Sequence, residues 1–252
     1  MIKFINIGSG SKGNGTLFYN DKDLILVDYG LTLEALNNAL SLINKSINDI
    51  EAVFITHDHS DHIKSLIYLP DEMPVYAGLS PLIKHQYTVI KERHSITVGS
   101  FTVMPCRTSH DASYPLGFII SDEDTKFGYV TDTGRLTKTT MKALSNCDYY
   151  IFEANHDPQM LSFSNRPLRL INRIRSTKGH LNNENSAKYL LKMIGPHTKK
   201  VYLAHLSEEC NTPALALETE KEVFRKAGVE IPDNFFTCLK QWEMTKGPSD
   251  ED

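Results

Sequence analysis

The segment Thr56-His-Asp-His-Ser-Asp-His62 places three imidazoles and two carboxylates within six consecutive positions, directly after the apolar run at residues 52–55. So many titratable groups in one short loop are costly unless something neutralises them. His57 and His59 point the same way in extended backbone, and Asp61 and His62 stand where a helix could begin. The segment therefore predicts two sets of metal ligands that face one cavity.

Three further ligand-type side chains each follow a predicted strand: His110 after residues 101–107, Asp132 after 127–131 and His205 after 201–204. We expect them to join the cluster. The assignment that follows has three parts: His57, His59 and His110 on one ion, Asp61, His62 and His205 on a second, and Asp132 bridging the two. Imidazole and carboxylate ligands suit Zn²⁺, Mn²⁺ and iron alike, so two divalent ions are predicted without a decision between these metals. Asp28, at the end of the run 24–27, is the candidate carboxylate that orients a ligating histidine. For Asp58, a side chain that points outward into solvent is at least as good an interpretation as a role in the site.

The order of elements predicts an α/β fold with two sheets flanked by helices. Apolar runs typical of strands fall at residues 2–7, 16–20, 24–28, 52–55, 101–107, 116–120, 127–131, 149–152 and 201–204. Helical periodicity falls at residues 32–43, 137–144, 167–175, 183–193 and 213–227. No shift in composition marks a boundary, so residues 1–246 are predicted to form one domain, and the acidic segment 247–252 a disordered tail.

Composition narrows the class of protein. The 252 residues are 40% hydrophobic, and they include no apolar run long enough to span a bilayer and no signal segment, so a cytoplasmic location is expected. The four cysteines form no C-x-x-C pair and are expected to be free, mostly buried thiols. The net charge of −4 means that a polyanion must be met by a local basic patch.

One basic segment offers such a patch. Arg166, Arg169, Arg173, Arg175 and Lys178 occur within thirteen residues that contain no acidic side chain, and the first three recur at helical spacing. Leu168, Ile171 and Ile174 would form the opposite, apolar face. The hypothesis is a phosphate-binding stripe, and the alternative is a merely solvated helix face. Residues 8–15 add a Gly/Ser loop in which backbone N–H groups, Ser11 and Lys12 could bind phosphate.

Eight motifs together resemble the YycJ/WalJ branch of the metallo-β-lactamase-fold proteins over nearly the full length. They are Gly8-Ser-Gly-Ser-Lys-Gly-Asn14, Leu26-Val-Asp28, Thr56-His-Asp-His-Ser-Asp-His62, Ser109-His-Asp-Ala112, Thr131-Asp-Thr-Gly134, Glu153-Ala-Asn-His-Asp157, Gly179-His-Leu-Asn-Asn183 and Leu203-Ala-His-Leu-Ser207. The resemblance implies a four-layer αββα sandwich, a dinuclear site built from the seven ligands above, and 5′-to-3′ exodeoxyribonuclease activity. Two departures concern the substrate: Asp58 stands where relatives usually carry Glu, and Glu208-Glu-Cys-Asn211 replaces a more Asn-rich stretch.

The expected chemistry is attack by a hydroxide that bridges the two ions, with Asp61 counted among the catalytic groups. A departing alkoxide also benefits from a proton donor, for which His180 is the candidate. Glu153, at the end of a predicted strand, could orient His180, and the pair resembles the Glu–His dyad of ribonuclease Z enzymes. The alternatives are a capping or packing role for His180 and a structural role for Glu153.

The leading hypothesis is therefore a metal-dependent phosphodiester hydrolase, a nuclease acting on DNA, with RNA left open. A first alternative is a phosphodiesterase for cyclic nucleotides or other small phosphodiesters. Thioester or lactam hydrolysis and a metal-binding protein without turnover are further alternatives. No membrane partner is expected, and a homodimer is left open.

Overall fold

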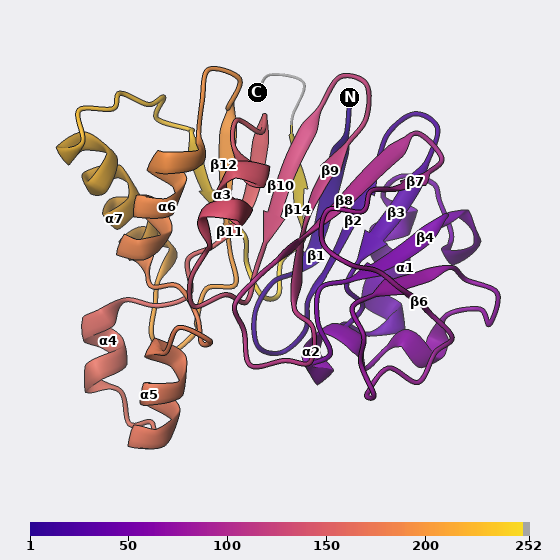
Figure 1. Ribbon diagram of the computed structural model, residues 1–252, viewed down its shortest axis with the longest axis horizontal. Helices are drawn as coiled ribbons and strands as arrows, with labels where there is room; N and C mark the ends of the chain where they lie inside the picture. Colours follow the sequence, from indigo (N-terminus) through magenta and orange to yellow (C-terminus); the bar gives the residue numbers. More distant parts are fainter. Residues whose placement is uncertain (249–252) are drawn as a thin grey trace.

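Two seven-stranded sheets pack face to face between outer helices in the computed structural model, which describes residues 1–248 (Figure 1). The first sheet has the order β14-β1-β2-β3-β4-β5-β6. Its strands are β1 (Lys3–Gly8), β2 (Gly15–Tyr19), β3 (Leu24–Val27), β4 (Ala52–Ile55), β5 (Val75–Ala77), β6 (Thr88–Val89) and β14 (Thr245–Gly247). Strands β3 to β6 run parallel, so their carboxyl ends share one edge of the sheet.

The second sheet mirrors this plan with the order β13-β12-β11-β10-β9-β8-β7. Its strands are β7 (Ile96–Val98), β8 (Phe101–Arg107), β9 (Leu116–Ser121), β10 (Lys126–Val130), β11 (Tyr149–Glu153), β12 (Lys200–Ala204) and β13 (Phe236–Cys238). Strands β10 to β13 are parallel, and β7 to β10 are antiparallel.

Helices form the outer layers, and most begin at a side chain that accepts a backbone N–H. The helices are α1 (Leu33–Ser41), α2 (Ser60–Ile63), α3 (Lys138–Leu144), α4 (Pro158–Phe163), α5 (Leu168–Arg175), α6 (Asn183–Met193) and α7 (Pro213–Lys226). Thr32, Thr137, Asp157, Asn182 and Thr212 cap α1, α3, α4, α6 and α7. Helices α4 and α5 project from the body as an arm (Figure 1).

Successive side chains along each strand point to opposite faces of its sheet, and this divides the core into layers. Phe4 and Phe18 point between the sheets, where both meet Phe127 of the opposite sheet with ring centroids 5.9 and 5.4 Å away. Their neighbours Ile5 and Leu17 point the other way and pack under α1. A third cluster lies between the second sheet and α3, α6 and α7. The order of layers is helix, sheet, sheet, helix, which confirms the predicted αββα fold.

Every predicted strand and helix is present, with bounds that agree or differ by at most two residues, but several short elements were missed. Strands β5, β6, β7, β13 and β14 have two or three residues each, too few to show a period-2 pattern. The predicted tail began too early, because Gly247 is the last residue of β14 and pairs with Phe4. The remainder of that prediction, residues 249–252, lies outside the described residues.

Two expectations from composition can be compared with the structure. All four cysteines are free, and Cys106, Cys147 and Cys210 are buried, as predicted. Burial raises the pKa of the Cys106 thiol to about 12, so this sulfur is an inert thiol. Among the described residues, no helix combines the length and the apolar character that crossing a membrane requires.

A buried carboxyl group in α7 leads to the first prediction. Glu220 is fully buried and neither of its oxygens makes a hydrogen bond within the described chain. Burial raises the pKa of Glu220 well above its ordinary value of 4.5. The folded protein therefore holds this proton more tightly than the unfolded chain, and stability falls as the pH rises above that value.

Glu220→Gln should raise the free energy of unfolding at pH 7 by about 1–3 kcal/mol, because no charge or proton uptake is then required inside the core. The gain should disappear near pH 4, where both states of the wild-type protein carry the proton. Urea unfolding of both proteins at the two pH values measures this difference. A gain of equal size at both values would contradict the assignment.

Candidate metal centre and active site

The cluster predicted from the sequence forms at the edge where the strands of both sheets end. His57 follows β4 and is buried, and His59 is the N-cap residue of α2. Asp61 and His62 lie within that single helical turn, as expected. The extended backbone before α2 and the helical backbone within it direct two groups of side chains toward the same space.

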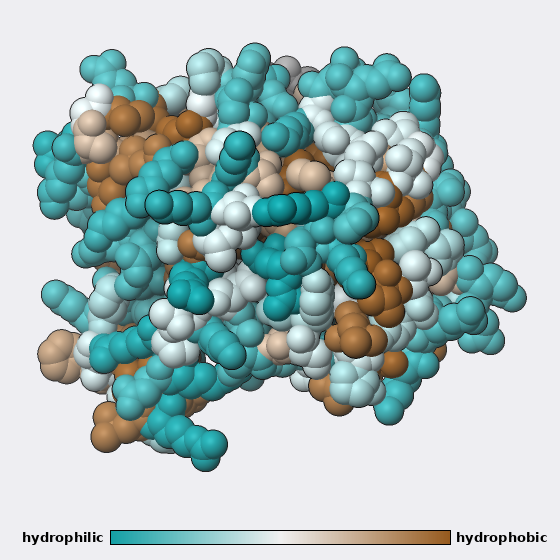
Figure 2. Space-filling model, viewed as in Figure 1, coloured by the Kyte–Doolittle hydropathy of each residue, from teal (hydrophilic) through white to brown (hydrophobic). Residues whose placement is uncertain are grey.

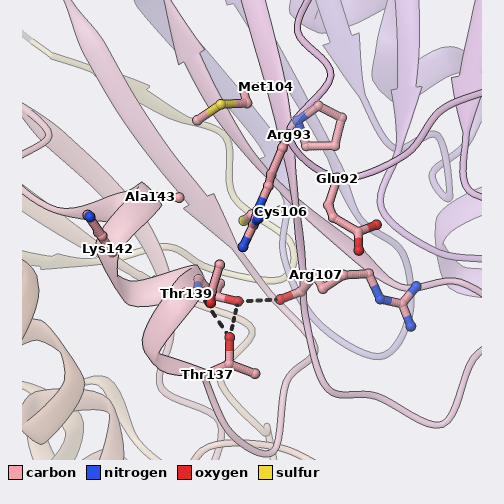
Figure 3. Close-up of a pocket in the computed structure, with 11 residues that line it drawn as sticks. Glu92, Arg93, Met104, Cys106, Arg107, Thr137, Thr139, Lys142 and Ala143 are labelled. Carbon is pink, nitrogen blue, oxygen red and sulfur yellow. Dashed lines mark hydrogen bonds between the residues drawn. The ribbon is translucent and has the colours of Figure 1, made fainter.

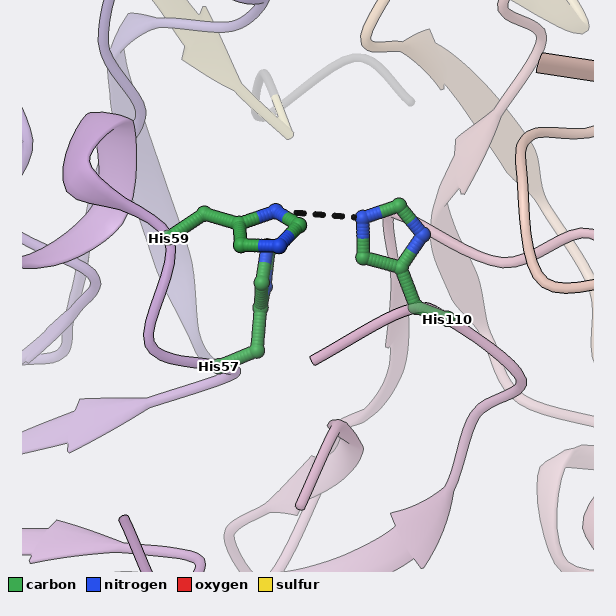
Figure 4. A group of neighbouring side chains, drawn as sticks. All are labelled: His57, His59 and His110. Atoms are coloured by element: carbon green, nitrogen blue, oxygen red, sulfur yellow. Dashed lines mark hydrogen bonds between the residues drawn. The ribbon is translucent and has the colours of Figure 1, made fainter. Parts of the chain in front are cut away.

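The first group consists of His57, His59 and His110 (Figure 4). The Nδ1 atom of His59 lies 3.3 Å from Nε2 of His110, although the two residues come from different sheets. The other ring nitrogen of His110, Nδ1, lies 3.0 Å from the carbonyl oxygen of Gly179 and donates to it, which leaves Nε2 facing the group. The structure thus brings together three imidazoles that the sequence assigned to one ion.

The second group consists of Asp61, His62 and His205. Asp132 lies between the two groups: its Oδ2 is 3.4 Å from Nε2 of His62, and its Oδ1 is 3.7 Å from Nε2 of His110. Oδ1 is also 3.6 Å from Nε2 of His205. The carboxylate therefore has the central position that the bridging assignment requires.

Three of these strand-end residues adopt backbone conformations that favour glycine. Asp28, Asp132 and His205 have φ values of 60°, 54° and 57°. Each follows β3, β10 or β12 by one or two residues, at the point where the chain turns into the site. Non-glycine residues in this region cost of order 1–3 kcal/mol each, and such strain collects at functional sites.

Asp28 holds the first sheet's part of the site together. Its Oδ2 accepts from Nδ1 of His62 at 2.8 Å, so Nε2 of His62 points toward Asp132 and lies 3.0 Å from Nδ2 of Asn14. Its Oδ1 accepts the backbone N–H of Thr56, also at 2.8 Å. The Thr56 hydroxyl lies 3.1 Å from Nδ1 of His57, a role that the sequence analysis did not assign to it. The expectation for Asp58 was wrong, because this side chain is buried and accepts the backbone N–H of Ser113 at 3.2 Å.

The unsatisfied atoms of the cluster fit a divalent cation. Nε2 of His57, Nε2 of His205 and Oδ2 of Asp132 are buried and make no hydrogen bond within the described chain. Buried polar atoms are nearly always paired, so three unpaired nitrogen and oxygen atoms at one place indicate a missing partner. Imidazole nitrogens and carboxylate oxygens are ordinary ligands of divalent metals.

The local charges also favour a cation. Burial lowers the pKa of His57 well below its ordinary value. Burial opposes a charged His205 too, yet Asp132 and Glu153 outweigh it and raise the pKa of His205 to about 9. Burial alone would raise the pKa of Asp132, but His205 and His62 hold it well below its ordinary value. The carboxylates therefore draw positive charge into a region that is shielded from water.

The predicted Glu153–His180 pair forms beside this cluster. Oε1 of Glu153 accepts from Nδ1 of His180 at 2.8 Å, and it lies 3.2 Å from Nδ1 of His205. Oε2 accepts the backbone N–H groups of Thr133 at 2.9 Å and Leu181 at 3.1 Å. Burial would raise the pKa of Glu153, but the two histidines lower it to about 2. The fully buried carboxylate is thus charged and fixed at both oxygens.

A pocket of about 340 Å³ opens next to His180. Its walls come from the loop after β1, the arm and the loop after β12: Ser11, Asn155, Arg166, Leu170, Arg173, Ile174, His180, Ser207 and Glu209. Two of the predicted phosphate-binding arginines line it, but each already has a carboxylate partner. Arg166 Nε donates to Glu209 at 3.0 Å, and Arg173 Nη2 donates to Asp111 at 2.9 Å.

The predicted stripe needs correction. Arg166 precedes Pro167, the N-cap residue of α5, so it does not share a helix with Arg169 and Arg173. Leu168 is 77% exposed and does not belong to the apolar face of α5. Ile171 and Ile174 form that face, and they pack against Leu161 and Cys210. Arg169, Arg175 and Lys178 are exposed and do not line the pocket. Only sequence spacing was available to the prediction, and spacing does not reveal where a helix begins.

The glycine loop after β1 is shaped by close packing. A Cβ atom at Gly13 would lie 2.3 Å from the carbonyl oxygen of Gly30, and one at Gly10 would lie 2.4 Å from Oε1 of Gln241. The backbone N–H of Lys12 donates to Gln241. No contact of the Lys12 side chain with another described residue supports phosphate binding. Asn14, which the sequence analysis did not single out, places Nδ2 3.3 Å from Oδ2 of Asp61 and donates to it. Its position in a Gly-rich motif was the only signal for it.

A larger pocket of about 610 Å³ lies elsewhere, between β8, α3 and the loop that contains Arg93 (Figure 3). None of the predicted site residues lines it. Its basic side chains are Arg93, Arg107 and Lys142, without a histidine beside them. The chemistry that the sequence predicts is therefore concentrated at the smaller pocket.

Comparison with known proteins places this geometry in a family. Residues 24–206 match the model of the "Beta-lactamase superfamily domain". The chain belongs to the β-lactamase superfamily. It is 32% identical to exodeoxyribonuclease WalJ of Streptococcus pneumoniae serotype 2 (strain D39 / NCTC 7466), over 93% of this chain and 92% of that protein. It is also 32% identical to exodeoxyribonuclease YycJ of Bacillus anthracis, over 93% of both chains.

Solved structures show the same superfamily fold. The metallo-β-lactamase-fold protein YhfI of Bacillus subtilis superposes with a TM-score of 0.71 at 18% identity, over 98% of this chain and 99% of that one. The family match and the curated relatives together identify this superfamily member as a hydrolytic enzyme. Its cluster of histidines and aspartates is of the kind that holds a divalent metal.

Gly30 provides a test of how the fold builds the centre. A Cβ atom there would lie 1.6 Å from the carbonyl oxygen of Asp61, so only glycine lets α2 approach β3. Gly30→Ala should lower the free energy of unfolding by about 3 kcal/mol or more and reduce the zinc bound after reconstitution. Denaturant unfolding and elemental analysis measure the two effects.

Gly228→Ala is the matched control. Gly228 has a φ of +71° but no atom within 4 Å of an added Cβ atom. It should cost about 1–2 kcal/mol from backbone strain and leave bound metal unchanged. Equal losses of stability and of metal in the two variants would contradict a specific role for Gly30.

Proposed function

We propose that the protein is a metal-dependent nuclease that removes nucleotides from the 5′ end of DNA, with RNA as the open alternative. The central position of Asp132 between two groups of ligand-type side chains carries the proposal, since it is the arrangement that a dinuclear hydrolase needs. The names of the two curated relatives, both exodeoxyribonucleases, support the choice of DNA.

Seven side chains would hold the metal. We assign His57, His59 and His110 to one ion, Asp61, His62 and His205 to the other, and Asp132 to both. Zn²⁺ and Mn²⁺ are the proposed metals, and iron is compatible with the same donors. When bound, two divalent ions would activate water and stabilise the negative charge that develops on the phosphate. Asp28 would orient His62 through Nδ1.

His180 would supply the proton that the departing alkoxide needs. Its Nδ1 atom is held by Glu153, so Nε2 is the nitrogen left for the substrate. Because Glu153 is buried and held at both oxygens, it keeps the imidazole in one orientation. The ring lines the pocket that contains Arg166 and Arg173, beside the proposed ligands.

The arginines of the pocket would receive the phosphates of the substrate strand. Arg166 and Arg173 each bind a carboxylate in the free protein, so a phosphate must compete with Glu209 and Asp111. An exposed guanidinium can exchange such a partner at small cost, because exposed ion pairs contribute little. Ser11 lines the same pocket and offers a hydroxyl. Arg169, Lys178 and Lys12 remain proposals without a contact to support them.

A small phosphodiester, such as a cyclic nucleotide, is the second candidate substrate. The pocket volume of about 340 Å³ is within the range typical of small-molecule sites. No contact in the described residues favours a thioester, a lactam or a protein without turnover over these two candidates. The cytoplasmic location and the single domain stay predictions, and a homodimer stays open.

Incubation of the purified protein with a 5′-phosphorylated single-stranded DNA and Mn²⁺ or Zn²⁺ tests the proposal. We expect mononucleotides to appear from the 5′ end, and chelation by EDTA to stop their release. Turnover of a cyclic nucleotide with no cleavage of DNA or RNA would favour the second candidate.

His180→Ala should lower turnover by about 10²–10⁴-fold while the bound metal stays the same, because the variant removes only the proton donor. Steady-state kinetics and elemental analysis measure the two quantities. His85→Ala, at a histidine that no part of the site uses, is the matched control. Unaltered turnover in His180→Ala would remove this residue from the mechanism.

A further inference from the structure

The only tryptophan of the chain, Trp242, lies in the loop between β13 and β14 with 67% of its surface exposed. This loop is anchored to the loop after β1. The backbone N–H of Ser9 donates to the carbonyl oxygen of Lys240 at 3.2 Å. Gln241 accepts the backbone N–H of Lys12 at 3.0 Å and donates to the carbonyl oxygen of Gly13 at 2.9 Å. These bonds fix the backbone just before Trp242 to the loop that contains Ser11, one of the residues that line the active-site pocket.

The indole ring is also held by a residue of the loop after β12. Its Nε1–H donates to Oε1 of Glu208 at 2.7 Å. Glu208 stands between Ser207 and Glu209, both of which line the pocket, and Glu209 binds Arg166. The loop that carries Trp242 is thus bound to the loop after β1 and to the loop after β12, and both of these loops contribute residues to the pocket that contains His180.

An exposed aromatic ring in this setting has a specific use. Proteins that bind single-stranded nucleic acids combine a cationic groove for the backbone with aromatic side chains on which bases stack. Here the arginines come from the arm, over which Figure 2 shows hydrophobic colour. Phe163 and Leu168, both exposed, belong to the same arm. The hydrogen bond to Glu208 already restricts rotation of the indole ring. Less conformational entropy is therefore lost when a base binds to it.

We propose that Trp242 is a stacking platform for an unpaired nucleobase of the strand whose phosphate enters the pocket. This inference rests on the proposed nuclease function and specifies its substrate as a single-stranded nucleic acid end. Stacking tolerates all four bases, because every base has a flat π face. The enzyme would therefore select for an unpaired strand and not for a sequence.

Because Trp242 is the only tryptophan, its fluorescence reports directly on the ring. The His180→Ala protein, loaded with Zn²⁺ to slow cleavage, is titrated with a 5′-phosphorylated oligothymidylate and with an abasic oligonucleotide of equal length. We expect quenching that saturates with the oligothymidylate and little change with the abasic strand. Equal responses to both strands, or no response while anisotropy of a labelled strand reports binding, would overturn the proposal.

Substitution provides the second measurement. Trp242→Ala should weaken oligothymidylate binding about tenfold, and Trp242→Phe should restore most of it, because an aromatic face is retained. Tyr68→Ala, at an exposed aromatic residue in the first half of the chain, should bind like the parent protein. Thermal unfolding of each variant checks that it is folded. Loss of affinity equal in Trp242→Ala and Trp242→Phe would exclude stacking.

The two hypotheses fail in different ways. A wild-type protein that binds the oligothymidylate with quenching but never cuts it would reject the nuclease function and retain the platform. A wild-type protein that cuts the strand while Trp242→Ala binds it normally would reject the platform alone.

Discussion

The buried carboxylate of Asp132 is the constraint on which the rest of the site depends. It lies within 3.7 Å of imidazole nitrogens from His62, His110 and His205, which the chain delivers from three separate loops. A charged carboxylate in this environment is stable only with positive charge around it. The two sheets must therefore close on each other with their strand ends aligned before the carboxylate is satisfied.

The alignment of the strand ends requires strained backbone conformations at three residues. Asp28, Asp132 and His205 all have positive φ values, and none is a glycine. At Gly30, by contrast, the approach of α2 leaves no room for a side chain at all. The interior between the sheets is filled with interlocking aromatic rings, such as Phe4, Phe18 and Phe127, and this packing supports the strained edge.

Charge changes sign between the centre of the site and its mouth. The centre combines histidines with buried carboxylates and attracts a cation, whereas Arg166 and Arg173 face the entrance. Both arginines are paired with carboxylates, those of Glu209 and Asp111, so in a protein of net charge −4 their positive charge is available to a polyanion only when these carboxylates are displaced. A substrate phosphate would replace a carboxylate and would not meet a bare positive surface.

The amino-acid sequence by itself determined the layers of the fold and the list of ligand-type residues, because both follow from local patterns. Period-2 alternation marks the strands, and the clustering from His57 to His62 marks the centre. Only the tertiary structure decided which residues meet. Three contacts each join segments far apart in the chain: Arg173 with Asp111, Asp58 with the backbone of Ser113, and Trp242 with Glu208. Contacts of this kind arise from the register and packing of the two sheets, which no local pattern records.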